Sequence, residues 1–114
     1  MSDCLFCKII AGDIPADKIY EDDDMVAFRD IAPQAPQHIL IVPRKHIINL
    51  SDLSEAEDAL IGKMMRTAAK IAADNGIGDG YRTIINNGAP AGQEVFHLHM
   101  HILGGAPLGP LVSK

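Results

Sequence analysis

The chain has 114 residues, 47% of them hydrophobic and 22% charged, with a formal net charge of −5. The length suits a single domain over residues 1–114, and the composition is that of a folded globular protein rather than a disordered one. The sequence has no basic stripe for a nucleic-acid backbone, no apolar run near the roughly 20 residues that span a membrane, and no secretory signal. We therefore expect a cytoplasmic protein that binds neither nucleic acid nor membrane.

The first third of the chain predicts one short helix followed by strands. The apolar segment 5–11 has the character of a short helix that Gly12 and Pro15 would stop. The segment 30–37 contains two prolines and is predicted to be a loop. Strands are predicted at 18–21, 25–29 and 38–42, the last an apolar, β-branched run that Pro43 ends.

The middle of the chain predicts one long helix. Ser51 or Ser54 can cap its start, and Glu57 lies three residues after Ser54, which is the spacing of a capping box. The pair Asn75 and Gly76 suits the end of the helix, because both residue types adopt left-handed backbone readily. Apolar residues recur at helical spacing at Ala56, Leu60, Met64, Ala68 and Ile71.

The last third predicts a strand at 81–86, a glycine-rich loop at 87–93, a strand at 95–103 and a loose tail at 104–114. Strands that follow one another without regular intervening helices favour an antiparallel sheet with segregated helices. The fold class predicted is therefore α+β, with one long helix and a short N-terminal helix.

Three of the five histidines alternate with apolar residues in the predicted strand 95–103. Side chains on a strand alternate between its faces, so His97, His99 and His101 are expected on one face. The opposite face is expected in the core and consists of Phe96, Leu98, Met100 and Ile102.

The histidine row has three interpretations. The imidazoles could form hydrogen bonds at a surface, or bind a catalytic metal with an open coordination position. Alternatively, one imidazole acts as nucleophile or general base while its neighbours hold an anionic substrate. The glycine-rich loop before the strand favours this third interpretation, because its backbone N–H groups can approach an anion closely.

The run H-L-H-M-H-I-L at 97–103 resembles the signature of the histidine-triad (HIT) family, three alternating histidines followed by two apolar residues. The likeness extends to L-F-C-K-I-I-A-G-D-I-P-A at 5–16, to P-Q-A-P-Q-H-I-L-I-V-P after Asp30, to A-G-Q-E-V before the triad and to A-P-L-G-P-L near the C-terminus. These segments cover nearly the whole chain. They are most similar to bacterial members of the Hint branch, the histidine-triad nucleotide-binding proteins.

This resemblance implies a HIT-like fold, a homodimer whose two sheets join, and purine nucleoside phosphoramidase activity on P–N bonds without an organic cofactor. In the family the middle histidine attacks phosphorus and forms a nucleotidyl-histidine, which assigns the nucleophile to His99. His38 and His101 match positions that hydrogen-bond the phosphate. The other matching positions contact the nucleotide: Asp30 at the ribose hydroxyls, Leu5, Phe6, Ile9, Phe28, Ile31 and Leu40 around the base, and Asn86, Gly92, Gln93 and Glu94 in the phosphate-side loop.

Several alternatives stay open from the residues alone. Phe28 and Leu40 fit the hydrophobic core as well as a base pocket. Glu94 stands where animal Hint proteins carry a serine, and a carboxylate beside a phosphate repels it unless it is protonated or turned away. The chain could also be a zinc-dependent hydrolase that uses all three triad histidines, or a nucleotide-binding module without activity.

Cys4 and Cys7 have the spacing of one half of a tetrahedral zinc site. Some HIT relatives complete such a set with two histidines, and the resemblance assigns His46 and His97 to that role. A closed four-ligand site would be structural and would tie the N-terminus to the histidine strand. The alternative is a pair of reduced, buried thiols, because cytosolic thiols are mostly reduced.

The long helix carries small and flexible residues on more than one face. A monomer would leave part of this surface exposed, so the pattern independently favours an interface between two copies of the chain. The residues concerned are Ala56, Ala59, Gly62, Met64, Met65, Ala68 and Ala69.

Overall fold

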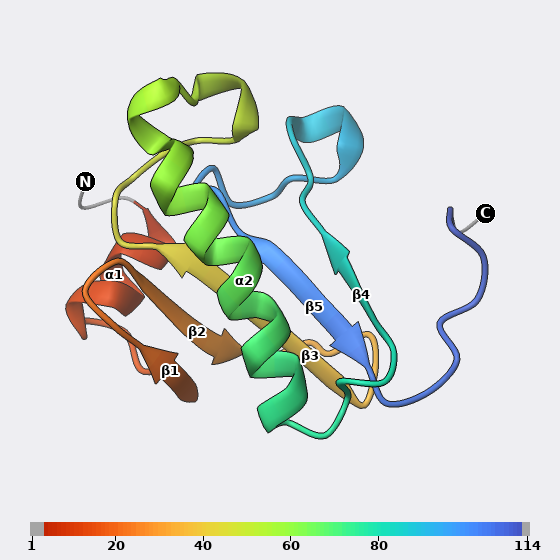
Figure 1. Cartoon of the computed structure of the whole chain (residues 1–114). Coiled ribbons are helices and arrows are strands. Elements are labelled where there is room, and N and C mark those ends of the chain that lie inside the picture. The colour runs from red at the N-terminus through yellow and green to blue at the C-terminus, as the bar shows by residue number, and fades with distance from the viewer. Residues whose placement is uncertain (1–3, 113–114) are drawn as a thin grey trace.

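The computed structural model describes residues 4–112 and places five strands in one sheet with a long helix, α2, across it (Figure 1). The strand order is β1-β2-β3-β5-β4, and every neighbouring pair is antiparallel. This arrangement confirms the predicted α+β class. The strands are β1 (Lys18–Glu21), β2 (Met25–Arg29), β3 (Gln37–Pro43), β4 (Tyr81–Ile84) and β5 (Met100–Gly104), and the helices are α1 (Leu5–Ala11) and α2 (Asp58–Asp74).

The capping box predicted for the long helix is present, one turn earlier than α2 itself. Ser54 caps a 3₁₀ turn, Glu55–Glu57, that leads directly into α2. Oε1 of Glu57 accepts a hydrogen bond from the backbone N–H of Ser54, and Oε2 accepts one from Lys45 at 2.7 Å. The helix therefore begins at a point that is tied to the loop after β3.

The two faces of the sheet bury different partners. Alternate residues of the strands, such as Met25, Ile41 and Met100, pack with Met64 and Ile71 of α2 in one core cluster. On the other face a second cluster contains residues from α1, β2 and β3: Phe6, Ile9, Val26, Phe28, Leu40 and Val42. Because side chains alternate along a strand, the second face is also where His38 and His101 project.

The predicted strand 95–103 is wrong in its first half, because β5 begins only at Met100. The partner strand β3 ends at Pro43, and its carbonyl oxygen accepts a hydrogen bond from Nε2 of His97 at 2.8 Å instead of joining a ladder. The N–H of Leu98 donates to Ile47 in the loop after β3. Only His101 of the triad therefore lies on a regular strand.

The expectation for Phe96 is also wrong, since its side chain is 48% exposed. The other three residues of the expected core face, Leu98, Met100 and Ile102, are buried. β4 ends at Ile84 rather than at residue 86. The tail has no helix or strand over residues 105–112, and its last two residues lie outside the described part. No helix within residues 4–112 has the length and apolar character needed to cross a membrane.

Candidate active site

A cavity of about 520 Å³ opens on the α1 side of the sheet. Its size falls in the range of small-molecule sites, about 300–1,000 Å³. All three predicted catalytic residues and all the predicted nucleotide-binding residues except Gln93 line it. The cavity is also lined by residues that were not predicted as site residues, among them Ile14, Pro15, Arg29, Gln34 and Val95.

The apolar wall of the cavity combines buried and exposed side chains. Phe28 and Leu40 are 4% and 5% exposed, belong to a core cluster and also line the cavity, so both interpretations of these residues hold. Leu5 is 43% exposed and Ile31 is 98% exposed. An aliphatic side chain in solvent at the rim of an apolar cavity suits contact with a flat, apolar ligand face.

Gln93 supports the glycine-rich loop from within. Its side chain is 3% exposed, accepts from the N–H of Gly88 at 2.7 Å, and donates to the carbonyls of Ile48 and Val95. Gly88 and Gly92 have φ values of 93° and 105°, a region that favours glycine. Gln93 therefore shapes the loop and does not line the cavity.

The triad residue His99 is oriented by the backbone. Its Nδ1 lies 2.7 Å from the carbonyl oxygen of His97. A carbonyl only accepts, so Nδ1 carries the proton and Nε2 of a neutral ring keeps a lone pair. The ring of Phe6 packs edge-on against it at a centroid distance of 5.0 Å. Burial lowers the pKa of His99, which keeps the ring neutral and nucleophilic at pH 7.

His38, His101 and Asp30 form a connected group beside His99. Nε2 of His38 lies 2.9 Å from Nδ1 of His101 and 3.5 Å from Oδ2 of Asp30. The other oxygen of Asp30 accepts from the N–H of Ala32 at 2.8 Å. Burial lowers the pKa of His38, and burial together with the neighbouring imidazoles lowers the pKa of His101 to about 4. The group therefore holds neutral imidazoles at physiological pH.

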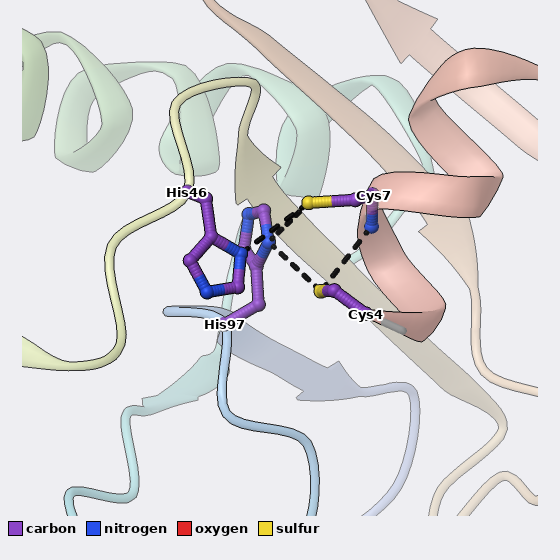
Figure 2. Close-up of side chains that lie close together, drawn as sticks. All are labelled: Cys4, Cys7, His46 and His97. Carbon is purple, nitrogen blue, oxygen red and sulfur yellow. Dashed lines mark hydrogen bonds between the residues drawn. The ribbon is translucent and has the colours of Figure 1, made fainter. Parts of the chain in front are cut away.

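The four residues predicted as metal ligands also come together, and we call them the Cys–His cluster: Cys4, Cys7, His46 and His97. Figure 2 shows them converging from α1, from the loop after β3 and from the segment before β5. Their ligand atoms lie within 4.8 Å of one another. Nδ1 of His97 is 3.4 Å from Sγ of Cys4 and 3.6 Å from Sγ of Cys7, and Nδ1 of His46 is 3.3 Å from Sγ of Cys7.

The Cys–His cluster fits a tetrahedral zinc ion. With Zn–S near 2.3 Å and Zn–N near 2.0–2.1 Å, the S···N edges of the tetrahedron should be about 3.5 Å, which the three distances match. The Pro43 carbonyl accepts the Nε2–H of His97, so Nδ1 presents its lone pair to the thiols. Burial lowers the pKa of His97, in keeping with a neutral ligand.

The Cys–His cluster is directly connected to the triad. His97 contributes its ring to the cluster and its carbonyl to His99. Phe6, between Cys4 and Cys7 in α1, contacts the rings of both His97 and His99. The position of α1 is therefore linked to that of His99 in two ways, through His97 and through the ring of Phe6.

Comparisons with known proteins agree with the geometry. The family model of the HIT domain matches residues 11–108. The purine nucleoside phosphoramidase of Escherichia coli strain K12 is 52% identical over 110 residues, covering 96% of this chain and 92% of that protein.

Solved structures give the same result. A HIT family hydrolase from Clostridium thermocellum has a TM-score of 0.95 and 44% identity, over 99% of each chain. A histidine triad protein from Clostridium difficile has a TM-score of 0.92 and 45% identity, over 98% of each chain. The chain belongs to the HIT family, as the H-L-H-M-H-I-L motif predicted.

Proposed function

We propose that this protein is a purine nucleoside phosphoramidase that hydrolyses the P–N bond of adenosine or guanosine 5′-phosphoramidates. The observation that carries the proposal is the state of His99, a neutral imidazole whose Nδ1–H is held by a backbone carbonyl and whose Nε2 bonds to none of residues 4–112. The 52% identity to a bacterial protein of that name supports the substrate class.

The proposed reaction has two displacements. Nε2 of His99 attacks phosphorus, the P–N bond to the amine breaks, and the amine leaves with a proton taken from water, which the attacking water of the second step gives back to solvent. Water then attacks the nucleotidyl-histidine, the bond between phosphorus and His99 breaks, and a nucleoside monophosphate is released. Dividing the reaction into two steps replaces one difficult displacement with two easier ones.

Substrate recognition follows from the cavity lining. His101 and the backbone of the loop containing Gly92 would hold the phosphate, since neutral donors and glycine amides suit an anion. Asp30 can accept from two ribose hydroxyls, which favours a ribonucleotide such as AMP. The base would lie against the apolar wall near Ile31.

The test is hydrolysis of adenosine 5′-phosphoramidate, with and without a metal chelator. Turnover that survives chelation supports the metal-free mechanism, whereas loss of turnover in a protein that stays folded points to a zinc-dependent hydrolase. Binding of AMP without turnover of any phosphoramidate would make the chain a binding module.

The covalent step has its own test. Rapid quenching with labelled substrate should trap acid-labile label on the wild-type protein. Imidazole should restore part of the activity of His99→Gly by attacking phosphorus from the vacated position. A single displacement with inversion at phosphorus and no trapped label would make His99 a general base.

For the Cys–His cluster we propose a structural zinc ion. The ion would supply no reaction chemistry, only four bonds that hold α1 against the segment containing His97. The match of the S···N distances to a tetrahedron supports zinc over two unliganded thiols. A reducing compartment keeps thiols such as Cys4 and Cys7 available, and on this ground we place the protein in the cytoplasm.

We also propose a homodimer. Of the residues expected at an interface on the long helix, Met64 and Ala68 are buried in the core of the chain itself, so they do not contribute. Met65 is 53% exposed, and an exposed apolar side chain among small residues supports a surface covered by a second copy. The others are exposed as well: Ala56, Ala59, Gly62 and Ala69.

A further inference from the structure

A backbone amide fixes the proton of His38. The N–H of Gln34 lies 2.9 Å from Nδ1 of His38 and can only donate. A nitrogen that accepts a hydrogen bond must present a lone pair, so neutral His38 carries its own proton on Nε2. That Nε2 is 2.9 Å from Nδ1 of His101 and 3.5 Å from Asp30, so the hydrogen bond goes to His101.

The same logic fixes the proton of His101. Its Nδ1 accepts from His38, so its own proton lies on Nε2. Nε2 of His101 bonds to no other described residue, and no buried side-chain nitrogen or oxygen among residues 4–112 lacks a partner, so this atom is open to the cavity. His101 therefore presents an N–H donor to the cavity through Nε2, whereas His99 presents the lone pair of its Nε2.

We propose that His38 is a positioning residue that acts through His101, and that the backbone amide of Gln34 sets the direction of this hydrogen-bond chain. The inference rests on the proposed function, in which His101 donates to the phosphate of the substrate. It revises the expectation from the resemblance, in which His38 bonds the phosphate directly. Both ring nitrogens of His38 are already engaged, and the residue is only 6% exposed.

A metal ion held by the same residues is the competing explanation. Asp30, His38 and His101 place three potential ligand atoms within 4.8 Å of one another. To bind a metal through Nε2, neutral His38 would need its proton on Nδ1, where it would face the N–H of Gln34. Two donors would then oppose each other beside the buried ring of His38, and the amide of Gln34 would lose its acceptor, which is costly. The Gln34 amide therefore favours the hydrogen-bond chain.

The chain matters because a neutral imidazole has two forms. With its proton on Nε2, His101 offers a donor to the cavity; with its proton on Nδ1, it offers only a lone pair, which an anionic phosphate repels. Burial lowers the pKa of both His38 and His101 and keeps the rings neutral. The fixed tautomer therefore supplies the hydrogen-bond donor to an anion that a charged imidazolium would otherwise supply. Successive hydrogen bonds also polarise one another and strengthen the last donor.

The first test needs no substrate. Nitrogen NMR of the ¹⁵N-labelled full chain at neutral pH should show His38 and His101 protonated on Nε2 and bare on Nδ1. Protonation of His101 on Nδ1 would overturn the proposal, whatever the variants do.

Two substitutions at Gln34 test the origin of the direction. Gln34→Ala keeps the backbone N–H and should keep the tautomer of His38. Gln34→Pro removes that N–H, leaves the rings of His38 and His101 in place, and should allow protonation of His38 on Nδ1. The same tautomer in both folded variants would show that the amide does not set the direction.

The second test is a double-mutant cycle measured by hydrolysis of adenosine 5′-phosphoramidate. His38→Leu should lower kcat by about 10- to 100-fold, less than the 10²–10³-fold loss that is typical when a preorganised donor itself is removed. His38→Gln, whose amide offers both an acceptor and an N–H, should recover most of that loss. In a His101→Ala background, His38→Leu should lower kcat further by less than about threefold. The effects of residues that act through one another are not additive.

The outcomes separate the two proposals. If the losses of His38→Leu and His101→Ala multiply, His38 acts on the substrate by itself and the inference is wrong. If the wild-type protein hydrolyses no phosphoramidate, the proposed function fails, and the NMR measurement alone then decides the inference about His38.

Discussion

The protein should become less stable as the pH falls from 7 to 5, because the folded state keeps His101 neutral while the unfolded chain takes up a proton there. His101 has a pKa of about 4 in the folded protein, against 6.5 for the unperturbed residue, because burial and the neighbouring imidazoles disfavour its charged form. Between these values the unfolded chain binds a proton that the folded protein does not. The free energy of unfolding therefore rises with pH between these two pKa values. The contribution of His101 is lost as the pH falls through the same range.

The size of the effect follows from the two pKa values. Full linkage between pKa 6.5 and pKa 4 lowers the free energy of unfolding by about 2 kcal/mol at pH 5 relative to pH 7. Solvent reaches part of the His101 ring, so we expect about 1–2 kcal/mol from this residue. Asp22 and Glu57 do not interfere: the pKa of each is lowered to about 2, so their contribution is lost only below about pH 4.5.

The assay is urea denaturation at pH 7 and pH 5, at one protein concentration, for the wild type and for His101→Gln. Each protein is compared with itself, so a uniform loss of stability in the variant does not affect the result. His101→Gln should lose less stability between the two pH values, by about 1–2 kcal/mol. Equal losses in both proteins would refute the assignment of a depressed pKa to His101.

Three further predictions concern the zinc ion, the dimer and Glu94. Protein purified without added metal should contain about one zinc per chain, and Cys4→Ser together with Cys7→Ser should lower the melting temperature; absence of metal with an unchanged melting temperature would leave two reduced thiols. Sedimentation at micromolar concentration should show a dimer that Met65→Lys weakens, and a wild-type monomer would contradict the interface. Glu94 lines the cavity and forms no hydrogen bond or ion pair with residues 4–112. Its carboxylate would repel a bound phosphate, so Glu94→Gln should bind AMP about fivefold more tightly at low salt. The gain should be smaller at high salt, which screens the repulsion. Glu55→Gln, on the exposed turn before α2, is the control, and equal affinity in the two variants would show that the Glu94 carboxylate is turned away from the phosphate.

Local sequence patterns predicted most of the helices and strands, and the family motif predicted the residues of the site. Alternation of apolar residues, proline and glycine positions and the Ser54–Glu57 spacing are local signals, and each led to an element that the structure contains. The motif around His99 was equally informative because the family keeps these residues close together in the chain. The resemblance to the family, and no local pattern, therefore predicted which side chains meet in the cavity, because most of them come from distant segments.

How these side chains are held depends on contacts that form only in the folded chain. The pattern of alternation predicted a continuous strand through His97 and His99, but β3 ends at Pro43 and gives its carbonyl to His97, so the sheet cannot continue there. Likewise, no sequence pattern shows that a backbone amide from the loop before β3 reaches His38. Backbone N–H and C=O groups are the same in every residue and leave no trace in the sequence, yet here they set which nitrogen of each imidazole carries the proton.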